Sequence, residues 1–592
     1  MPAAAPPRPA PHRSRRSALR ARSLTSSFVV PALIASVLAG CGSSHQSGSA
    51  ADPAALAPAA APLYAGATVR PGGMLKSDAL SAGSSLTHQA DPYLRLLAAL
   101  QTPGSPALSF GHDIAPWLGP HAGVFLSSLG SAGALSSLLQ QGLLGGASTG
   151  GFPFGAGRAQ GAIVLDTTDV AKARGFLDGQ ARRAGAHASS YRGVAYQVGS
   201  GGASFAVVSR AAVIGSESGV HEVIDTALGA PSLARQAGYA KLLAAAPSDA
   251  LAHVYAAASA GASTTPSASA AGPEGISGII GVLSGGQQAN VSLVPAAAAL
   301  TLDADTLQGP ASGGATGLLA ADPEGAAALG ELPGESWLAV GLGHVATNLA
   351  SDVQALGALT SLAGSPTPSA EGTGAGGLNV KSLLAGLLAP LKALGANTAQ
   401  ARRDYARWMG SAGIFASGGS LLELKAAVVI ASKDPAASRA AVTPLADQLR
   451  RGGASLRPVS IPSAEAAIGV ASSGLPVVLD LASGRSSNGE TKFVLGFGEA
   501  SVGAALNPPS SLSSAAPRNA AGTALGEGIQ PSLIVDFPTL LSLLEGVGLS
   551  GDPTISKLVP YLRAATTLAG GGHSLGGGIE RFRLVLGLHP AG

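Results

Sequence analysis

Several segments of this sequence occur twice, in the same order, in its first and second halves. The stretch DIAPWLGPHAGVF (113–125) is similar to DYARWMGSAGIF (404–415), and TTDVAKARGFLDGQARRAGA (167–186) is similar to SKDPAASRAAVTPLADQLRRGGA (432–454). Upstream of these, LYAGATV is similar to SWLAVGL. Similar landmarks in an unchanged order indicate an internal duplication, which predicts two related structural units.

Each copy predicts a strand followed by a helix. The apolar runs GAIVLD and KAAVVIA precede Asp169 and Asp434, and apolar residues at helical spacing follow the first of these aspartates. We expect both aspartates to cap helix N-termini, which is a much commoner use of aspartate at such a junction than catalysis. Pro444 is expected to kink or restart the second helix.

Strands in each copy also follow one another directly. The stretch SFAVVSRAAVIGS (204–216) predicts two short strands around a turn, and Asn488-Gly489 between two apolar runs predicts a β-hairpin. Adjacent strands favour an α+β fold over a doubly wound parallel sheet. We therefore expect two tandem repeats, each a mainly antiparallel sheet packed with helices.

The chain has 592 residues, and single hydrophobic cores rarely grow beyond about 250–300 residues. We predict a signal peptide over residues 1–40, a flexible tether over 41–60, a first repeat over 61–325 and a second repeat over 326–592. The tether prediction rests on the small and polar residues of GSSHQSGSAADPAALAPAA (42–60).

The N-terminus has the pattern of an export signal. Arginines precede the apolar run FVVPALIASVL (28–38), which is too short to span a bilayer as a helix. The run ends in LAGC (38–41), which resembles the bacterial lipobox, so Cys41 is expected to receive a lipid. The alternative is an ordinary cleaved signal with Cys41 incidental. SRRSALR (14–20) is also similar to a twin-arginine signal except at Ala18, so the export route stays open.

Composition argues against two classes of site. Cys41 is the only cysteine, so the chain can form neither an internal disulfide nor a cysteine-based metal cluster. The chain has 36 Lys+Arg against 33 Asp+Glu, but residues 1–40 contain only arginines among the charged types. The predicted mature chain is therefore slightly acidic, and its charge gives no indication of nucleic-acid binding.

The stretch GHSLG (572–576) matches the G-x-S-x-G nucleophile elbow of serine hydrolases, which needs a strand before Ser574 and a helix after it. Here the alternation in IERFRLVLGL predicts a strand after the motif, and YLRAATTLAGG predicts a helix before it. Glu580 and His589 are the only acid and histidine that follow, and both lie along one strand. We interpret the motif as a glycine-rich turn, with a serine hydrolase as the least favoured alternative.

Other motifs lack the context that their chemistry requires. GTGAGG (372–377) has the glycine spacing of a dinucleotide-binding loop but does not follow a strand. The histidines show no paired ligand spacing, so no cofactor or metal site is expected. His253 is expected to be a packed or surface residue. Trp117 and Trp408 are expected to anchor turns against the core rather than to stack on a ligand.

The sequence resembles the domain-of-unknown-function family 3352 of exported bacterial proteins. The stretches that carry the resemblance are DIAPWLGPHAGVF, LDTTDVAKARGFL, YRGVAYQV and AVIGSESGVHEVIDTALG. The second copy departs from the pattern, with RWMG (407–410) in place of PWLG. The resemblance implies an exported protein and transfers no catalytic residue.

These observations predict a lipid-anchored protein on the extracytoplasmic face of the cell membrane, with a non-enzymatic binding or scaffolding role. Its expected partners are the membrane, through the anchor, and envelope proteins or an apolar ligand; nucleic acid is not expected. The main alternative is a solute- or lipid-binding lipoprotein with a cleft between the two repeats.

Overall fold

The computed structural model describes residues 52–87, 109–128, 159–257, 288–307, 322–346, 399–420, 422–451, 453–471, 478–546 and 553–590. Cys41, the first part of the expected tether and the GTGAGG stretch lie outside these ranges. Within them, none of the helices is both long and apolar enough to span a bilayer.

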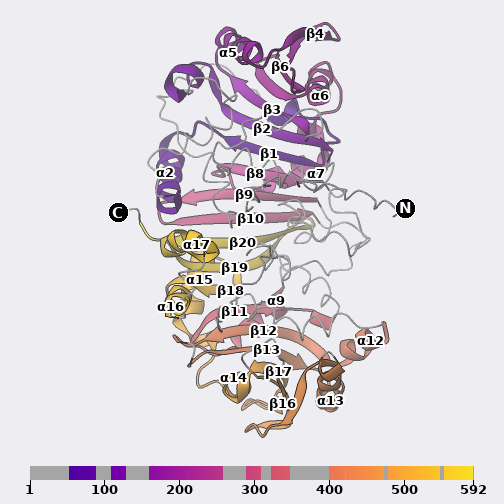
Figure 1. Ribbon diagram of the computed structural model, residues 1–592, viewed down its shortest axis with the longest axis vertical. Helices are drawn as coiled ribbons and strands as arrows, with labels where there is room; N and C mark the ends of the chain where they lie inside the picture. Colours follow the sequence, from indigo (N-terminus) through magenta and orange to yellow (C-terminus); the bar gives the residue numbers. More distant parts are fainter. Residues whose placement is uncertain are drawn as a thin grey trace, which may run out of the picture.

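The described strands form one 20-stranded sheet that runs the length of the molecule (Figure 1). The first half contributes β1 (Leu63–Thr68), β2 (Leu118–Ser128), β3 (Gln160–Thr167), β4 (His187–Tyr191), β5 (Val194–Val198), β6 (Ala203–Val208), β7 (Ala211–Ser216), β8 (Ala252–Ala256), β9 (Gln288–Ala296) and β10 (Ala299–Leu307). The second half contributes β11 (Ser336–Leu342), β12 (Met409–Ser417), β13 (Lys425–Ser432), β14 (Ser455–Pro458), β15 (Ala464–Ala471), β16 (Leu479–Arg485), β17 (Thr491–Phe497), β18 (Gln530–Asp536), β19 (Ala565–Gly576) and β20 (Ile579–Leu588).

All described neighbours in the sheet are antiparallel. The order is β4-β5-β6-β7-β3-β2-β1-β8-β9-β10, continued by β20-β19-β18-β11-β12-β13-β17-β16-β15-β14. Read outward from the central pair β10–β20, the two series are the same, with β11 in the place of β1 and so on to β20. A mixed helix and strand fold with a large antiparallel sheet is therefore confirmed.

The sheet is continuous, whereas the sequence analysis expected a separate sheet in each repeat. β10 pairs with β20 over its whole length, from Ala299 opposite Gly587 to Leu307 opposite Ile579. An unpaired edge strand offers a row of free backbone groups, and pairing the two edges removes both. Residues 325 and 326, where we placed the repeat boundary, lie inside helix α9 (Pro323–Gly330).

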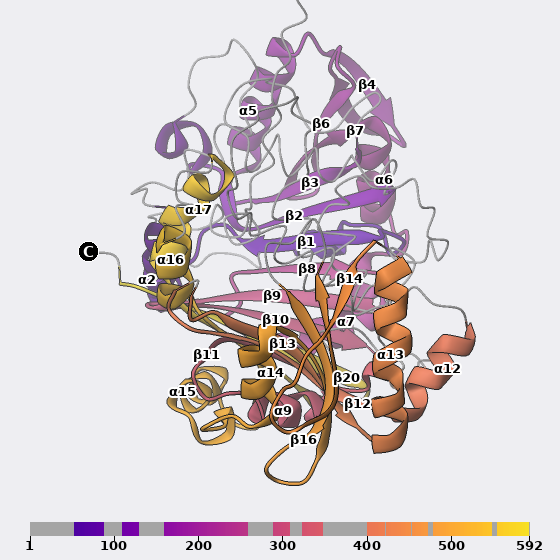
Figure 2. The same ribbon diagram turned by 60° about the horizontal axis from the view of Figure 1, so that its bottom comes forward.

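Helices cover both faces of each half (Figure 2). One face carries η1 (Pro53–Ala55), α6 (Glu217–Ala227), η4 (Leu233–Arg235) and α7 (Ala237–Ala245) in the first half, and α9, α14 (Gly498–Leu506), η6 (Leu512–Ser514) and α15 (Ala516–Leu525) in the second. The opposite face carries α2 (Gly73–Thr87) and α5 (Val170–Arg183), then α12 (Ala399–Trp408) and α13 (Pro435–Arg451). The remaining helices are η2 (Phe110–Ile114), α16 (Phe537–Gly546) and α17 (Pro553–Ala564).

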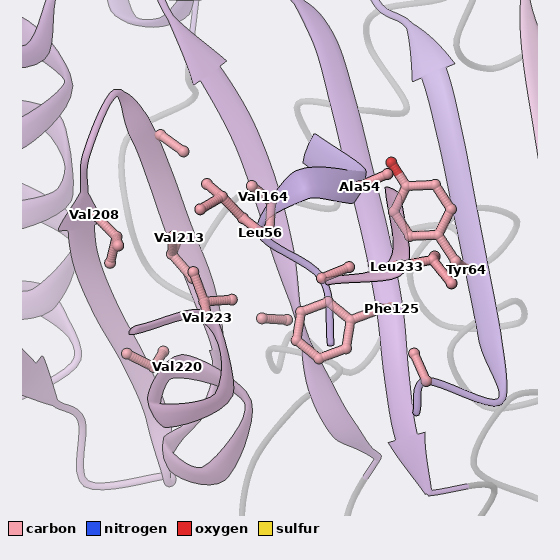
Figure 3. Packing of buried hydrophobic residues seen from close by; sticks show 14 of the residues in the cluster. Ala54, Leu56, Tyr64, Phe125, Val164, Val208, Val213, Val220, Val223 and Leu233 are labelled. Atoms are coloured by element: carbon pink, nitrogen blue, oxygen red, sulfur yellow. The ribbon is translucent and has the colours of Figure 1, made fainter. Parts of the chain in front are cut away.

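One of the hydrophobic cores of the first half lies between the sheet and α6. Phe125 and Val213 project from the strands toward Val220 and Val223 of the helix (Figure 3), and all four side chains are fully buried. Burial of such a side chain stabilises the fold by about 1.5–3 kcal/mol. Alternating apolar residues on the strands therefore fix which face each helix covers.

Residues 52–60 pack against the first half and do not extend the tether. Asp52 accepts a hydrogen bond from the backbone N–H of Ala54 at 2.9 Å and so begins η1. Ala54 and Ala57 are fully buried, and Ala57 accepts a backbone hydrogen bond from Leu233 at 2.8 Å. The small residues that suggested flexibility instead allow close packing on the sheet.

The local predictions about caps and turns are largely confirmed. Asp169 accepts a hydrogen bond from the N–H of Lys172, and Asp434 accepts one from Ala437, each at 3.0 Å. Asn488-Gly489 forms the turn between β16 and β17. The second helix does not restart at Pro444, because α13 runs unbroken from Pro435 to Arg451.

Candidate functional site

The GHSLG stretch lies at the tip of the β19–β20 hairpin. Ser574 is in β19, opposite Glu580 of β20, and residues 576–578 all have positive φ (81°, 61° and 78°). Glycine adopts such angles without steric cost, which explains the glycine run. The strand predicted after the motif is confirmed. The sequence predicted a helix over YLRAATTLAGG before the motif. This helix, α17, ends at Ala564, and the residues that follow belong to β19.

This strand–turn–strand context differs from the strand–turn–helix of a nucleophile elbow. The Ser574 hydroxyl accepts a hydrogen bond from the N–H of Gly576 at 3.3 Å. The neighbouring His573 points to the opposite face of the sheet, because side chains alternate along a strand. Desolvation lowers the pKa of His573, and the nearby arginines lower it further. His573 is therefore not placed to take a proton from Ser574.

Buried charges lie on β10 and β20, where the two halves meet. Arg581 donates to both carboxylate oxygens of Asp305 at 2.7 and 2.8 Å, and Arg583 donates to both oxygens of Asp303 at 2.7 Å. Both aspartates are fully buried. Two-pronged arginine–carboxylate pairs are among the strongest hydrogen-bonded contacts in proteins. We call these four residues the central ion pairs.

The same arginines bind the ends of two helices. Arg581 donates to the carbonyl of Ala245, where α7 ends, at 2.7 Å, and Arg583 donates to that of Leu525, where α15 ends, at 3.2 Å. Helix C-termini carry partial negative charge, so cations stabilise them. The hydrogen bonds with Asp303 raise the pKa of Arg583. Paired strands and the central ion pairs thus occupy the position where the sequence analysis allowed a cleft between repeats.

An aromatic cluster lies under α7 in the first half and contains Tyr64, Tyr239, Tyr255 and His253. The Tyr239 hydroxyl is 3.1 Å from Nε2 of His253, and the Tyr64 and Tyr239 rings are 5.8 Å apart. Burial lowers the pKa of His253 to about 4, so its ring is neutral at pH 7. A Cβ on Gly66 would lie 2.6 Å from the His253 ring. The cluster is closely packed, in agreement with the expectation for His253.

Two of the stretches that resemble the family, YRGVAYQV and AVIGSESGVHEVIDTALG, contact each other on the surface of the first half. The His221 ring of α6 stacks on Tyr191 at 3.9 Å, and its Nε2 lies 2.8 Å from the Tyr196 hydroxyl. Tyr196 donates to Glu217 at 2.7 Å, and Tyr191 donates to Asp225 at 3.2 Å. These contacts hold the β4–β5 hairpin against α6, which gives the two stretches a structural role.

A pocket of about 610 Å³ lies in the second half, between the beginning of β11, the ends of β12 and β18, and helices α15 and α16. Its walls combine apolar side chains with carboxylates, including Trp337, Val535, Leu568, Glu335, Glu423 and Asp536. Ligand pockets for small molecules commonly measure about 300–1,000 Å³. The volume of this pocket, called the second-half pocket below, falls within that range.

The tryptophans that the sequence analysis singled out serve the core. Trp117 and Trp408 are nearly inaccessible, with 1% and 2% of their surface exposed. Trp117 donates its indole N–H to the carbonyl of Asp113 at 2.7 Å, which anchors the turn before β2. The described residues contain no group of three or more histidine, cysteine or acidic side chains with metal-binding geometry.

Residues 38–452 match the family model described as "Protein of unknown function (DUF3352)". The chain belongs to the DUF3352 family. No curated protein matches the sequence. A solved structure titled "Structure of crystal form I of TP0453" is similar over 44% of this chain and 80% of its own length, with 9% identity and a TM-score of 0.24. We draw nothing about this DUF3352 protein from so low a score.

The second-half pocket was missed by sequence reasoning, which compared Trp337 only as a strand residue aligned with Tyr64. The strand register differs from that alignment, because Tyr64 lies opposite Phe125, whereas Ala339 lies opposite Phe415. Trp337 falls at a register shift in β11. The one signal in the sequence that could have indicated the pocket was a tryptophan at the second position of a short strand.

Proposed function

We propose that this DUF3352 protein is a lipid-anchored protein of the cell envelope, on the extracytoplasmic face of the membrane, with a non-enzymatic binding or scaffolding role. The observation that carries the proposal is the LAGC stretch that ends at Cys41, directly after the apolar run. The described part of the chain begins at Asp52. Eleven residues can span at most about 40 Å, so a lipid on Cys41 would keep the sheet close to the membrane.

The anchoring proposal is tested by Cys41→Ala, with Ser43→Ala as a matched control outside the lipobox. The alanine variant at Cys41 should be exported but should leave the detergent phase in a phase-partition assay, because stable attachment needs the acyl chains. The Ser43 variant should partition like the wild type. Unchanged membrane fractionation of Cys41→Ala would show that the lipobox interpretation is wrong.

We further propose that the two halves are tandem repeats of a common ancestor. The repeated order of strand pairing supports this, as do the aspartate caps of α5 and α13. An experimental structure in which these two helices had different strand neighbours would contradict it.

Binding of a small ligand is the second candidate role, favoured by the second-half pocket. The ligand site that we propose therefore lies within one half, rather than between the halves. A serine hydrolase that uses Ser574 remains the least favoured alternative, because its hairpin lacks the elbow geometry.

A further inference from the structure

One aromatic side chain, Trp337, lines the second-half pocket. Trp337 lies between two registered pairs, Ser336 with Ser417 and Leu338 with Ala416, and is therefore the extra residue of a β-bulge. Bulges redirect a side chain and occur frequently beside functional sites. The corresponding pair of the first half has no shift, because β1 and β2 pair without interruption from Leu63 to Thr68.

The hydrogen bond of Trp337 fixes which part of the ring a ligand can reach. Its indole N–H donates to the carbonyl of Gly418 at 3.1 Å, so the polar edge of the ring is satisfied within the protein. The side chain is only partly buried, and it lines the pocket together with Val535 and Leu568. A ligand would therefore meet an apolar wall and the π-face of the ring.

The charged side chains among the described lining residues of the pocket are all acidic. Glu335, Glu423 and Asp536 line it, and no lysine, arginine or histidine is among the described lining residues. Glu335 is partly neutralised by Lys425 at 3.0 Å. Asp536 accepts hydrogen bonds from Thr539 through Oδ2, and its Oδ1 has no hydrogen bond in the described part of the chain. The lining thus carries a net negative charge.

From this combination we infer that the second-half pocket binds an organic cation with an apolar body, such as an alkylammonium compound. The ring face attracts a cation through its quadrupole, and the carboxylates favour the same charge. The apolar walls bury the hydrocarbon part. The inference deepens the proposed binding role, and it does not depend on the lipid anchor.

The test uses the purified full-length chain and three short probes of equal chain length: hexyltrimethylammonium, hexanol and hexyl sulfate. Trp337 is the accessible tryptophan, since Trp117 and Trp408 are almost fully buried, so a change in tryptophan fluorescence reports on the pocket. We expect saturable binding of the cation, at least about tenfold weaker binding of hexanol, and no binding of the anion.

Two variants assign the binding to the pocket by calorimetry. Trp337→Leu keeps an apolar wall and should reduce the preference for the cation over hexanol about threefold or more, leaving the share due to the carboxylates. Asp536→Asn keeps a residue that can cap α16 and should weaken cation binding about fivefold or more while leaving hexanol unchanged. Equal affinity for cation and hexanol in the wild type, or unchanged cation binding in both variants, would overturn the inference. Neither outcome would bear on anchoring, which the Cys41 variant tests separately.

Discussion

The two halves of the sheet share one order of strand pairing but differ in the side chains that pack between the sheet and its helices. Under α7, the first half packs Tyr64, Tyr239 and His253 closely together. Under α15, the second half packs mainly aliphatic side chains, and beside them lies the second-half pocket. The same backbone arrangement therefore accommodates two different sets of core side chains, provided that each half keeps an apolar sheet face toward the helices.

The junction shows where the halves must differ. Asp303 and Arg583 lie directly opposite each other on β10 and β20. The hairpins β9–β10 and β19–β20 are built alike, so identical halves would place the same residue opposite itself at this position. Two buried aspartates or two buried arginines would repel each other in a medium of low dielectric constant. Opposite charges on the two strands make the junction stable within one chain.

The largest expected effect comes from breaking the central ion pairs. Asp303→Ala leaves the half-buried Arg583 without its carboxylate, which should lower the free energy of unfolding by about 3 kcal/mol, the lower end of the range for breaking a buried pair. Glu545→Ala removes an exposed pair with Arg563 at 2.8 Å and should cost less than about 1 kcal/mol. Urea unfolding at pH 7 measures both.

A charge-swapped variant sharpens the comparison between β10 and β20. Asp303→Arg combined with Arg583→Asp exchanges the charges of this pair and should recover only part of the loss. The pair is restored, but the arginine placed at position 303 meets Arg581, whose Nη1 lies 3.4 Å from Asp303. If Asp303→Ala costs no more than the exposed control, the ion pairs do not join the halves as we describe.

The features that depend on neighbouring residues can be predicted from the sequence. The caps at Asp169 and Asp434 and the turn at Asn488-Gly489 follow from local backbone chemistry. The central ion pairs join residues about 280 positions apart (Asp303 and Arg583), and nothing in either strand alone specifies that partner. Trp337 likewise becomes a pocket wall only through the bulge, which is set by pairing with β12.

A smaller effect is expected from acid, through His253 in the first half. The pKa of His253 is about 4 in the folded chain, below the value of about 6.5 in an unfolded chain. Protons therefore bind the unfolded chain more tightly, and stability present above pH 6.5 is lost as the pH falls toward 4. We expect His253 to account for a loss of about 2 kcal/mol between pH 7 and pH 5. Urea unfolding of wild type and His253→Gln at both pH values measures the difference.

The second half supplies a control of opposite sign. Asp480 is fully buried, its carboxylate has no hydrogen bond in the described part of the chain, and burial raises its pKa. Acid should therefore favour the folded state at this residue. Asp480→Asn should leave the His253-dependent loss in place. An equal acid loss in wild type and His253→Gln would show that the buried histidine is not its source.

The smallest expected effect is at Ser574, and it separates a structural hairpin from a catalytic one. The corresponding hairpin of the first half, β9–β10, turns at Ala297 and Ala298, and its tip (residues 294–300) contains no serine, so the hairpin itself needs no nucleophile. Ser574→Ala removes one 3.3 Å hydrogen bond with Gly576 and should change stability by less than about 0.5 kcal/mol.

A fluorophosphonate probe should not label the purified protein, because a serine hydroxyl reacts only when a base takes its proton. Stoichiometric labelling that disappears in the alanine variant would make the hydrolase interpretation the leading one. The sheet itself argues against that outcome, since a base would have to approach from the side of the hairpin opposite to His573.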